Sequence, residues 1–320
     1  MNTPLVSIWT LTYNHAPFIR QCIEGVLMQK TTFPFELLIH DDASTDGTAD
    51  IIREYEARYP DIIKPIYQTE NQFSKGGGIY RKFQLPRSQG KYIAICEGDD
   101  YWTDPLKLQK QVDFLETHPD YTICGGMWQV LKEGITEVTE NEGLVRDMAK
   151  FPNGRTVTLQ NYLDPYLLQT LTVCYRKECY NMEKRNQIKS SIDITSYAIL
   201  LEQGKGFIFP DCFGVYRIHQ GGIWQGKTYE QQLCMIVKNY RELVLHFGNK
   251  SKSIRKKYFE NCIELRFIEM KTRQHLLTDY LNMARFTFSG KINDVISFQI
   301  RHFTHKSRIH FINYCRKRFI

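Results

Sequence analysis

The sequence predicts an α/β fold: a Rossmann-like, mostly parallel sheet flanked by helices, followed by a helical and basic C-terminal extension. Three observations lead to this prediction. Four apolar runs of strand type alternate with segments of helical spacing over the first 118 residues. An acidic pair directly follows the second run, and another follows the fourth. From residue 229 onward the spacing is helical, and positive charge accumulates there.

The expected elements of the first part follow one another at short spacing. Strands are predicted at residues 5–11, 35–39, 62–67 and 91–96, and helices at 18–29, 48–58 and 105–118. Ser44 and Asp46 are suitable caps for the second helix, and Pro105 suits the first turn of the third. The polar segment 69–78 is expected to be a mobile loop. Alternation of this kind forms a parallel sheet with right-handed crossovers.

After residue 121 the pattern is looser, and fewer elements can be assigned. We expect a strand at 168–175, a helix at 192–202, two short strands at 207–209 and 215–217, and helical structure from 229 to the end. No internal repeat and no low-complexity linker interrupts this order.

The composition narrows the class of protein. A chain of 320 residues, 42% of them hydrophobic, can bury a substantial core. The sequence contains no run of eighteen or more apolar residues, the length that a membrane-spanning helix needs. We also expect no secretory signal. The nine cysteines contain no CxxC pair, so we expect reduced, mostly buried thiols in a cytoplasmic protein.

The charge is distributed unevenly along the chain. Residues 250–320 contain 16 Lys and Arg against 5 Asp and Glu, a balance of +11, so residues 1–249 carry −4 of the total of +7. Toward the C-terminus, apolar residues such as Phe303, Ile309 and Phe311 have basic residues between them. Such a segment either lies on an anionic membrane or packs on the rest of the protein with a solvated basic face.

Carboxylates follow two of the predicted strands. Asp41 and Asp42 come after the second strand, and Asp99 and Asp100 come after the fourth. Ligands bind at the carboxyl ends of the strands in an open α/β sheet. The first pair either accepts hydrogen bonds from a base or a sugar, or only shapes a turn.

The second pair is the stronger candidate for chemistry. Adjacent carboxylates raise each other's pKa unless a cation or a donor compensates. Their oxygens suit Mg²⁺ or Mn²⁺, ions that also bind substrate phosphates. The alternative is a solvated acidic turn before the next helix. Together the two pairs indicate one crevice for a nucleotide and a metal-bound diphosphate.

Three motifs, in this order and at this spacing, resemble those of family 2 glycosyltransferases. They are Val6-Ser7-Ile8-Trp9-Thr10-Leu11-Thr12-Tyr13-Asn14, Asp41-Asp42-Ala43-Ser44-Thr45-Asp46-Gly47-Thr48 and Glu97-Gly98-Asp99-Asp100-Tyr101-Trp102. The resemblance is strong over about residues 4–118 and extends to about residue 226. It implies a GT-A fold with a catalytic domain at 1–226, divided into a nucleotide-sugar-binding half at 1–120 and an acceptor-binding half at 121–226, and a helical extension at 227–320.

The resemblance also implies roles for single residues. It places Thr10, Tyr13 and Asn14 along the nucleotide, Asp42 on the base, Asp99 on the ribose or the metal, and Asp100 on the metal that holds the diphosphate. Glu97 is a modest departure from the acidic residue that usually opens the last motif. Candidates for phosphate contacts are Lys75, Arg81 and Lys82.

An inverting transfer needs a carboxylate that takes a proton from the acceptor hydroxyl. Asp193 begins a predicted helix and follows the strand at 168–175 at about the distance at which the family presents this base. The alternative is an ordinary first-turn Asp favoured by the helix dipole. Glu202 is the reserve candidate for the base.

A glycine-containing loop follows the last predicted strand. In such enzymes His219 would complete the metal site or touch the diphosphate, and Trp224 would stack on an acceptor sugar unless it is a core residue. The QxxRW signature of processive polymerising members is absent, so transfer of one sugar per encounter is expected.

The sequence therefore predicts an inverting, Mn²⁺- or Mg²⁺-dependent enzyme of surface polysaccharide biosynthesis. Its donor would be a nucleotide-diphosphate sugar and its acceptor a glycan or a lipid-linked glycan. We expect it in the cytoplasm, peripherally at the inner face of the cell membrane, with no nucleic acid as partner. One alternative is a sugar nucleotidyltransferase, which would need a Gly-rich loop after the first strand. The other is a non-catalytic carbohydrate-binding relative, which would have broken acidic pairs.

Overall fold

The structure, a computed structural model, describes residues 3–76, 78–190, 192–222 and 225–273. The chain divides into two compact units, Met1–Tyr258 and Phe259–Ile320. The sheet and the candidate site belong to the first unit. None of the described helices is both long enough and apolar enough to cross a membrane.

The first half of the sheet is parallel, as expected. Its strands are β1 (Val6–Thr12), β2 (Phe35–Asp41), β3 (Ile63–Tyr67) and β4 (Tyr92–Ile95), in the spatial order β3-β2-β1-β4. All pairs within this half are parallel. β1 is almost fully buried because β2 and β4 lie on either side of it, which explains its continuous apolar run.

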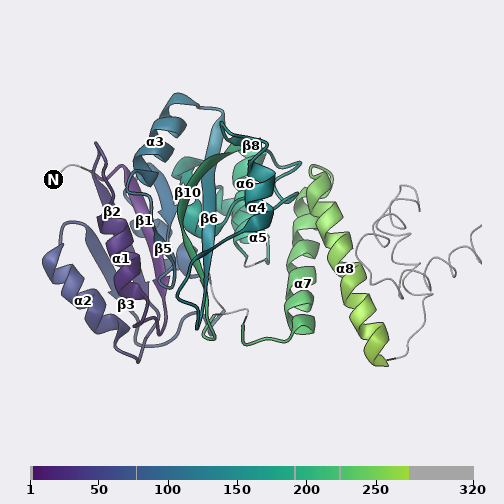
Figure 1. Cartoon of the computed structure of the whole chain (residues 1–320), viewed down its shortest axis with the longest axis horizontal. Helices are drawn as coiled ribbons and strands as arrows, with labels where there is room; N and C mark the ends of the chain where they lie inside the picture. The colour runs from purple at the N-terminus through teal and green to yellow at the C-terminus, as the bar shows by residue number, and fades with distance from the viewer. Residues whose placement is uncertain (1–2, 77, 191, 223–224, 274–320) are drawn as a thin grey trace, which may run out of the picture. The chain divides into compact units, whose positions relative to one another are not determined.

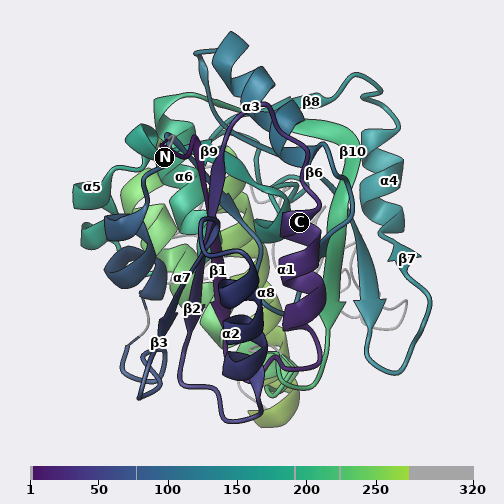
Figure 2. The same ribbon diagram turned by 90° about the vertical axis from the view of Figure 1, so that its left-hand side faces the viewer.

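The connections in this half are helical and place the strand ends at one edge. They include α1 (Ile19–Leu27), α2 (Thr48–Arg58), a π-helical turn η1 (Tyr80–Gln84) and a 3₁₀ turn η2 (Leu85–Arg87). Figures 1 and 2 show α1 and α2 on one side of the strands, with α5 (Met182–Gln187) and α6 (Asp193–Gln203) on the other. Both faces of the sheet are therefore covered, which agrees with the predicted fold class.

The second half of the sheet is mixed and contains strands that the sequence pattern did not reveal. Its members are β5 (Tyr101–Trp102), β6 (Tyr121–Lys132), β7 (Thr139–Glu140), β8 (Arg155–Val157), β9 (Cys174–Arg176) and β10 (Lys205–Ile218). β9 pairs antiparallel to β4 and β6, whereas β10 runs parallel to β6. The central order continues as β4-β9-β6-β10-β5.

Two expectations about this half were wrong in detail. The two short strands predicted at 207–209 and 215–217 are parts of the single strand β10, which shifts its register against β6 between Ile208 and Gly214. The strand predicted at 168–175 begins only at Cys174, after the 3₁₀ turn η3 (Thr170–Thr172). A bulged strand changes its period of two midway, so its sequence reads as two fragments.

The remaining helices are short except near the end of the described chain. They are α3 (Lys107–Thr117), α4 (Glu142–Met148), the 3₁₀ turn η4 (Lys177–Cys179), α7 (Tyr229–Phe247) and α8 (Lys252–Arg273). Thr228 and Gln231 form a capping box that starts α7 close to the predicted residue 229. The predicted helical structure beyond Arg273 lies outside the described residues.

Candidate active site

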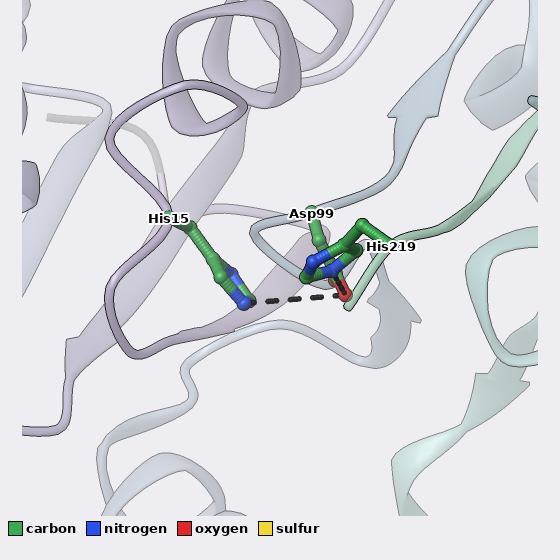
Figure 3. A group of neighbouring side chains, drawn as sticks. All are labelled: His15, Asp99 and His219. Carbon is green, nitrogen blue, oxygen red and sulfur yellow. Dashed lines mark hydrogen bonds and ion pairs between the residues drawn. The ribbon is translucent and has the colours of Figure 1, made fainter. Parts of the chain in front are cut away.

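The site lies where β1, β2 and β4 end, at one edge of the parallel half. The loop after β1 carries His15, the loop after β4 carries Asp99, and the end of β10 leads to His219. Figure 3 shows the three side chains pointing toward one another from these three segments. Residues that are 84 and 204 positions apart along the chain thus meet at one point.

One oxygen of Asp99 is the centre of this group. Its Oδ2 lies 3.1 Å from Nε2 of His219 and 4.0 Å from Nε2 of His15. One ligand atom of each residue falls within 4.8 Å of the others, an arrangement that could hold a metal ion. Two imidazoles and a carboxylate are the ligands that Mn²⁺ and the later first-row metals accept. The donor set could therefore hold a divalent metal, and the prediction of Mn²⁺ or Mg²⁺ stays a prediction.

The protonation states of His15 and Asp99 favour binding of a metal ion. Burial lowers the pKa of His15 more than the nearby Asp99 carboxylate raises it, so the ring is neutral at pH 7. Burial raises the pKa of Asp99, but its hydrogen bond with His219 and the charge that His15 carries in the acidic range where Asp99 titrates outweigh this and hold the pKa below its usual value. Neutral imidazole and ionised carboxylate are the forms that bind metals.

Asp100 is more deeply placed than Asp99. It is 1% exposed, and its Oδ1 accepts a hydrogen bond of 2.9 Å from the backbone N–H of Arg217. Burial and the neighbouring carboxylates of Asp99 and Glu97 raise its pKa well above the usual value. Asp100, Asp99 and Glu97 form a second group whose oxygens lie within 4.8 Å of one another. The role of Asp100 as a metal ligand stays a prediction.

Arg217 is a site residue that the sequence analysis missed. Its Nη1 donates to the backbone oxygen of Asp99 at 2.6 Å, and its Nη2 donates to Gln21 Oε1. Together with its N–H bond to Asp100, these contacts tie β10 to the loop after β4. The signal was present in the sequence, because Arg217 lies two residues before His219.

The surroundings of Glu97 favour the protonated form of its carboxyl group. The side chain is half-buried, and the Tyr80 hydroxyl donates to its Oε1 at 3.3 Å. Burial, followed by the charges of Asp99 and Asp193, raises the pKa of Glu97 to about 8. At neutral pH this carboxyl group is therefore mostly protonated and can donate a hydrogen bond.

The loops after β1 and β2 are held together by their polar residues. Asn14 Oδ1 accepts from the N–H of Thr45 at 2.8 Å, and the N–H of Asn14 donates to Ser44 Oγ at 2.8 Å. Asp46 accepts from the N–H groups of Ala16 and Thr48 at 2.9 and 3.0 Å. The N-cap of α2 is Gly47, so the predicted caps are wrong in position: Asp46 supports the helix from the residue before the cap, and Ser44 bonds to the neighbouring loop instead. Asn14 lies in an exposed position at this edge.

The first acidic pair, Asp41 and Asp42, is buried at the end of β2. Asp42 is 3% exposed, and its carboxylate accepts from the backbone N–H groups of Gln72 and Phe73 at 2.7 and 3.0 Å. It therefore anchors part of the loop predicted at 69–78. Asp41 Oδ1 is buried without a hydrogen-bond partner among the described residues, and burial raises the pKa of Asp41. The contact of Asp42 with a base stays a prediction.

The other residues predicted for the nucleotide lie at the same edge. Thr10 is fully buried, and its Oγ1 has no hydrogen-bond partner in the described part of the chain. Tyr13 is 46% exposed, and its contact with the nucleotide stays a prediction. Lys75 pairs with Glu70, and Arg81 donates to Asn186 Oδ1 at 3.0 Å, so these two candidate phosphate contacts are engaged within the protein.

The candidate base Asp193 is the first residue of α6. Its Oδ2 accepts from the hydroxyl of Thr170, which in turn accepts from the hydroxyl of Tyr197 at 3.2 Å. Its Oδ1 accepts from the N–H of Ile194 at 2.8 Å. The residue stays accessible to solvent, yet the protein around its carboxyl group raises its pKa, while the Thr170 and Ile194 bonds oppose the rise.

The reserve candidate is not part of this arrangement. Glu202 pairs with Lys184 and, at 2.6 Å, with Lys250. It lies nine positions after Asp193 in α6, a rise of about 14 Å. These ion pairs outweigh burial and lower its pKa. Trp224, the candidate for acceptor stacking, lies outside the described residues.

Comparisons with known proteins identify the family of this chain. Residues 7–165 match the family model described as glycosyl transferase family 2. An uncharacterized protein of Mycobacterium tuberculosis is 37% identical over 225 residues, which are 68% of this chain and 60% of that protein. The chain thus spans less than two thirds of the length of that relative. The putative teichuronic acid biosynthesis glycosyltransferase TuaG of Bacillus subtilis is 29% identical over 76% of this chain and 90% of its own length.

Solved structures show the same fold at low sequence identity. TarS of Staphylococcus aureus, in complex with UDP-GlcNAc, superposes with a TM-score of 0.58 at 19% identity, over 80% of this chain and 71% of that one. The mannosyltransferase PcManGT of Pyrobaculum calidifontis, in complex with GDP-Man and Mn²⁺, has a TM-score of 0.54 at 18% identity, over 89% and 80%. The strand-end motifs, the GT-A-like fold and the matching family model lead to one conclusion: this chain belongs to glycosyltransferase family 2.

Proposed function

We propose that the protein is an inverting, metal-dependent glycosyltransferase that moves one sugar from a nucleotide-diphosphate sugar to a hydroxyl of a glycan or lipid-linked acceptor. The observation that carries the proposal is the placement of Asp193. Its carboxylate accepts hydrogen bonds from the Thr170 hydroxyl and from the N–H of Ile194, so a carboxylate that can serve as the base is held in a fixed orientation at the start of α6. We propose that a donor bound at the strand-end carboxylates Asp99 and Asp100 presents its sugar to Asp193.

The chain's own groups account for each part of an in-line displacement. Asp193 accepts the proton of the acceptor hydroxyl as that oxygen attacks the anomeric carbon. The bond between this carbon and the diphosphate oxygen breaks on the opposite side, and the diphosphate leaves with the electron pair. One attack from the opposite side inverts the anomeric configuration, so no covalent sugar intermediate is needed.

Metal binding and hydrogen bonding supply the rest of the proposal. Asp99 and His219 would hold a divalent metal, with Asp100 as a further candidate. When bound, this ion neutralises charge on the departing diphosphate. Thr10, Tyr13, Asn14 and Asp42 stay the proposed contacts for the nucleotide. The Thr170 hydroxyl stabilises the ionised form of Asp193 and fixes its orientation.

The names of the relatives suggest the setting. A putative teichuronic acid enzyme and other putative glycosyltransferases, such as EpsE of Bacillus subtilis, are among the similar proteins. We therefore propose a role in surface polysaccharide biosynthesis. Residues 250–320 carry the excess of positive charge, which supports placing the enzyme peripherally on an anionic inner membrane face, in the cytoplasm.

A thermal-shift screen with the full chain tests the donor site. UDP-GlcNAc and GDP-Man, the ligands of the two solved structures, are the first probes, each with and without Mn²⁺. A nucleotide sugar at about 100 times its dissociation constant should add about 2.7 kcal/mol of stability. For a donor that binds, NMR should show a nucleoside diphosphate and an inverted sugar as the first products. Release of pyrophosphate, or retained configuration, would contradict the proposal.

A further inference from the structure

We infer that His15 is a third protein ligand of the divalent metal, beside Asp99 and His219, and that its imidazole makes the site favour Mn²⁺ over Mg²⁺. The inference rests on the proposed function, because it concerns the metal of the proposed transfer site. Neither the motifs nor the resemblance assigned His15 a role.

The distances in the group agree with ligands around one ion. A metal of this class binds imidazole nitrogen and carboxylate oxygen at about 2.0–2.2 Å. Two ligands at a right angle are then about 3 Å apart, and two on opposite sides are about 4 Å apart. The separations from Asp99 Oδ2 are 3.1 Å to His219 Nε2 and 4.0 Å to His15 Nε2. Figure 3 shows both rings turned toward that oxygen.

His15 is held in this position before any metal arrives. Its N–H donates to Thr48 Oγ1 at 2.9 Å, and its carbonyl accepts from the N–H groups of Phe18 and Ile19 at 2.9 and 2.8 Å. Its ring lies edge-on to the ring of His219, with centroids 5.7 Å apart. A ligand that is already oriented loses little conformational entropy on binding.

Only one nitrogen of His15 is available to a ligand. Nδ1 is buried without a hydrogen-bond partner among the described residues, and it lies 3.1 Å from the position that a Cβ on Gly98 would take. Nε2 is the atom that faces Asp99. The ring therefore presents Nε2 to the ion, and Gly98 leaves the space that this orientation needs.

The chemistry of the ligands sets the preference for the metal. Mg²⁺ prefers oxygen ligands, keeps several waters, and binds through one or two carboxylates together with substrate phosphates. Imidazole nitrogens suit transition metals instead, and their affinity rises from Mn²⁺ along the first row. With two imidazoles the protein should bind Mn²⁺ without any nucleotide, and an excess of Mg²⁺ should displace it poorly.

The test measures Mn²⁺ binding to the full chain by the loss of the free-ion EPR signal, with no nucleotide present. His15→Gln should weaken Mn²⁺ binding at least about tenfold. His118→Gln is the matched control, because His118 is exposed at the end of α3 and belongs to neither candidate metal group. His15→Asp, which replaces nitrogen by oxygen, should recover part of the binding and let Mg²⁺ compete better. Unchanged Mn²⁺ affinity in His15→Gln would overturn the inference.

Pulsed EPR on the wild-type protein gives a readout that needs no variant at position 15. Bound Mn²⁺ should show coupling to two imidazole nitrogens, and His219→Gln should leave one. Coupling to a single imidazole in the wild type would overturn the inference even if His15→Gln fails to fold. Failure of the proposed function has a different signature: Asp99→Asn would then bind Mn²⁺ as well as the wild type, or donor sugars would not be cleaved.

Discussion

The hydrogen bond from Thr170 to Asp193 offers a direct test of the proposed base. This bond favours the ionised carboxylate, because it opposes the rise in pKa that burial causes. A hydrogen bond to a charged group contributes about 1.5–3 kcal/mol. Since one pKa unit corresponds to about 1.36 kcal/mol, Thr170→Val should raise the pKa of Asp193 by about one to two units. The base must be ionised to accept a proton, so activity should be lost at a higher pH than in the wild type.

The assay is the pH profile of the maximal rate at saturating donor and acceptor. In Thr170→Val its acidic limb should move upward by the one to two units derived above, and the rate well above that limb should change less. Thr117→Val is the matched control, because Thr117 is exposed at the end of α3 and bonds only to groups on its own turn. An acidic limb that stays in place, or moves to lower pH, would refute the role of Asp193. Asp193→Asn should reduce the rate by about 10²–10⁴-fold with little change in donor affinity.

Three further outcomes are expected. Asp99→Asn should weaken Mn²⁺ binding more than Asp100→Asn, since Asp100 is bonded to the backbone of β10; equal losses in an EPR titration would argue against this order. Gly98→Ala should weaken Mn²⁺ binding and lower the melting temperature, because the added Cβ would lie 2.8 Å from the Thr12 side chain. Gly143→Ala is the control and should do neither, because its Cβ would meet only Asn141 Oδ1, at 3.5 Å. Truncation at about Gly290 should reduce co-sedimentation with anionic vesicles, a binding that added salt should weaken; equal sedimentation of both chains would leave the tail without a membrane role.

The sequence by itself determined the parallel half of the sheet and the edge where ligands bind. Strands β1 to β4 are local features, since each is a short apolar run bounded by turn residues. The acidic motifs follow two of these runs directly, so their place at the carboxyl ends came with the strand prediction. The family resemblance added the roles of Asp99 and Asp193, and the family model bears out the family itself.

The spacing of apolar residues did not predict those strands that form only because they pair with distant strands. β5 has only two residues and exists because it pairs with β10. β10 bends through register shifts against β6, so its sequence lacks one continuous alternation. The strand at Cys174 is short because the chain first forms a 3₁₀ turn, which places Thr170 beside Asp193. Such pairings are set by contacts between distant segments and leave no periodic signal in the sequence.

Only the tertiary structure decided which polar residues meet. His15 and His219 approach one oxygen of Asp99 because the ends of three separate segments converge at the edge of the sheet. Asp42 is equally acidic, yet its carboxylate is engaged by the backbone at Gln72 and Phe73. A single residue type does not reveal its partners, since hydrogen bonds and burial depend on the three-dimensional neighbourhood. The sequence therefore indicated which chemistry this site could perform, while the tertiary structure determined which of its side chains lie close to one another.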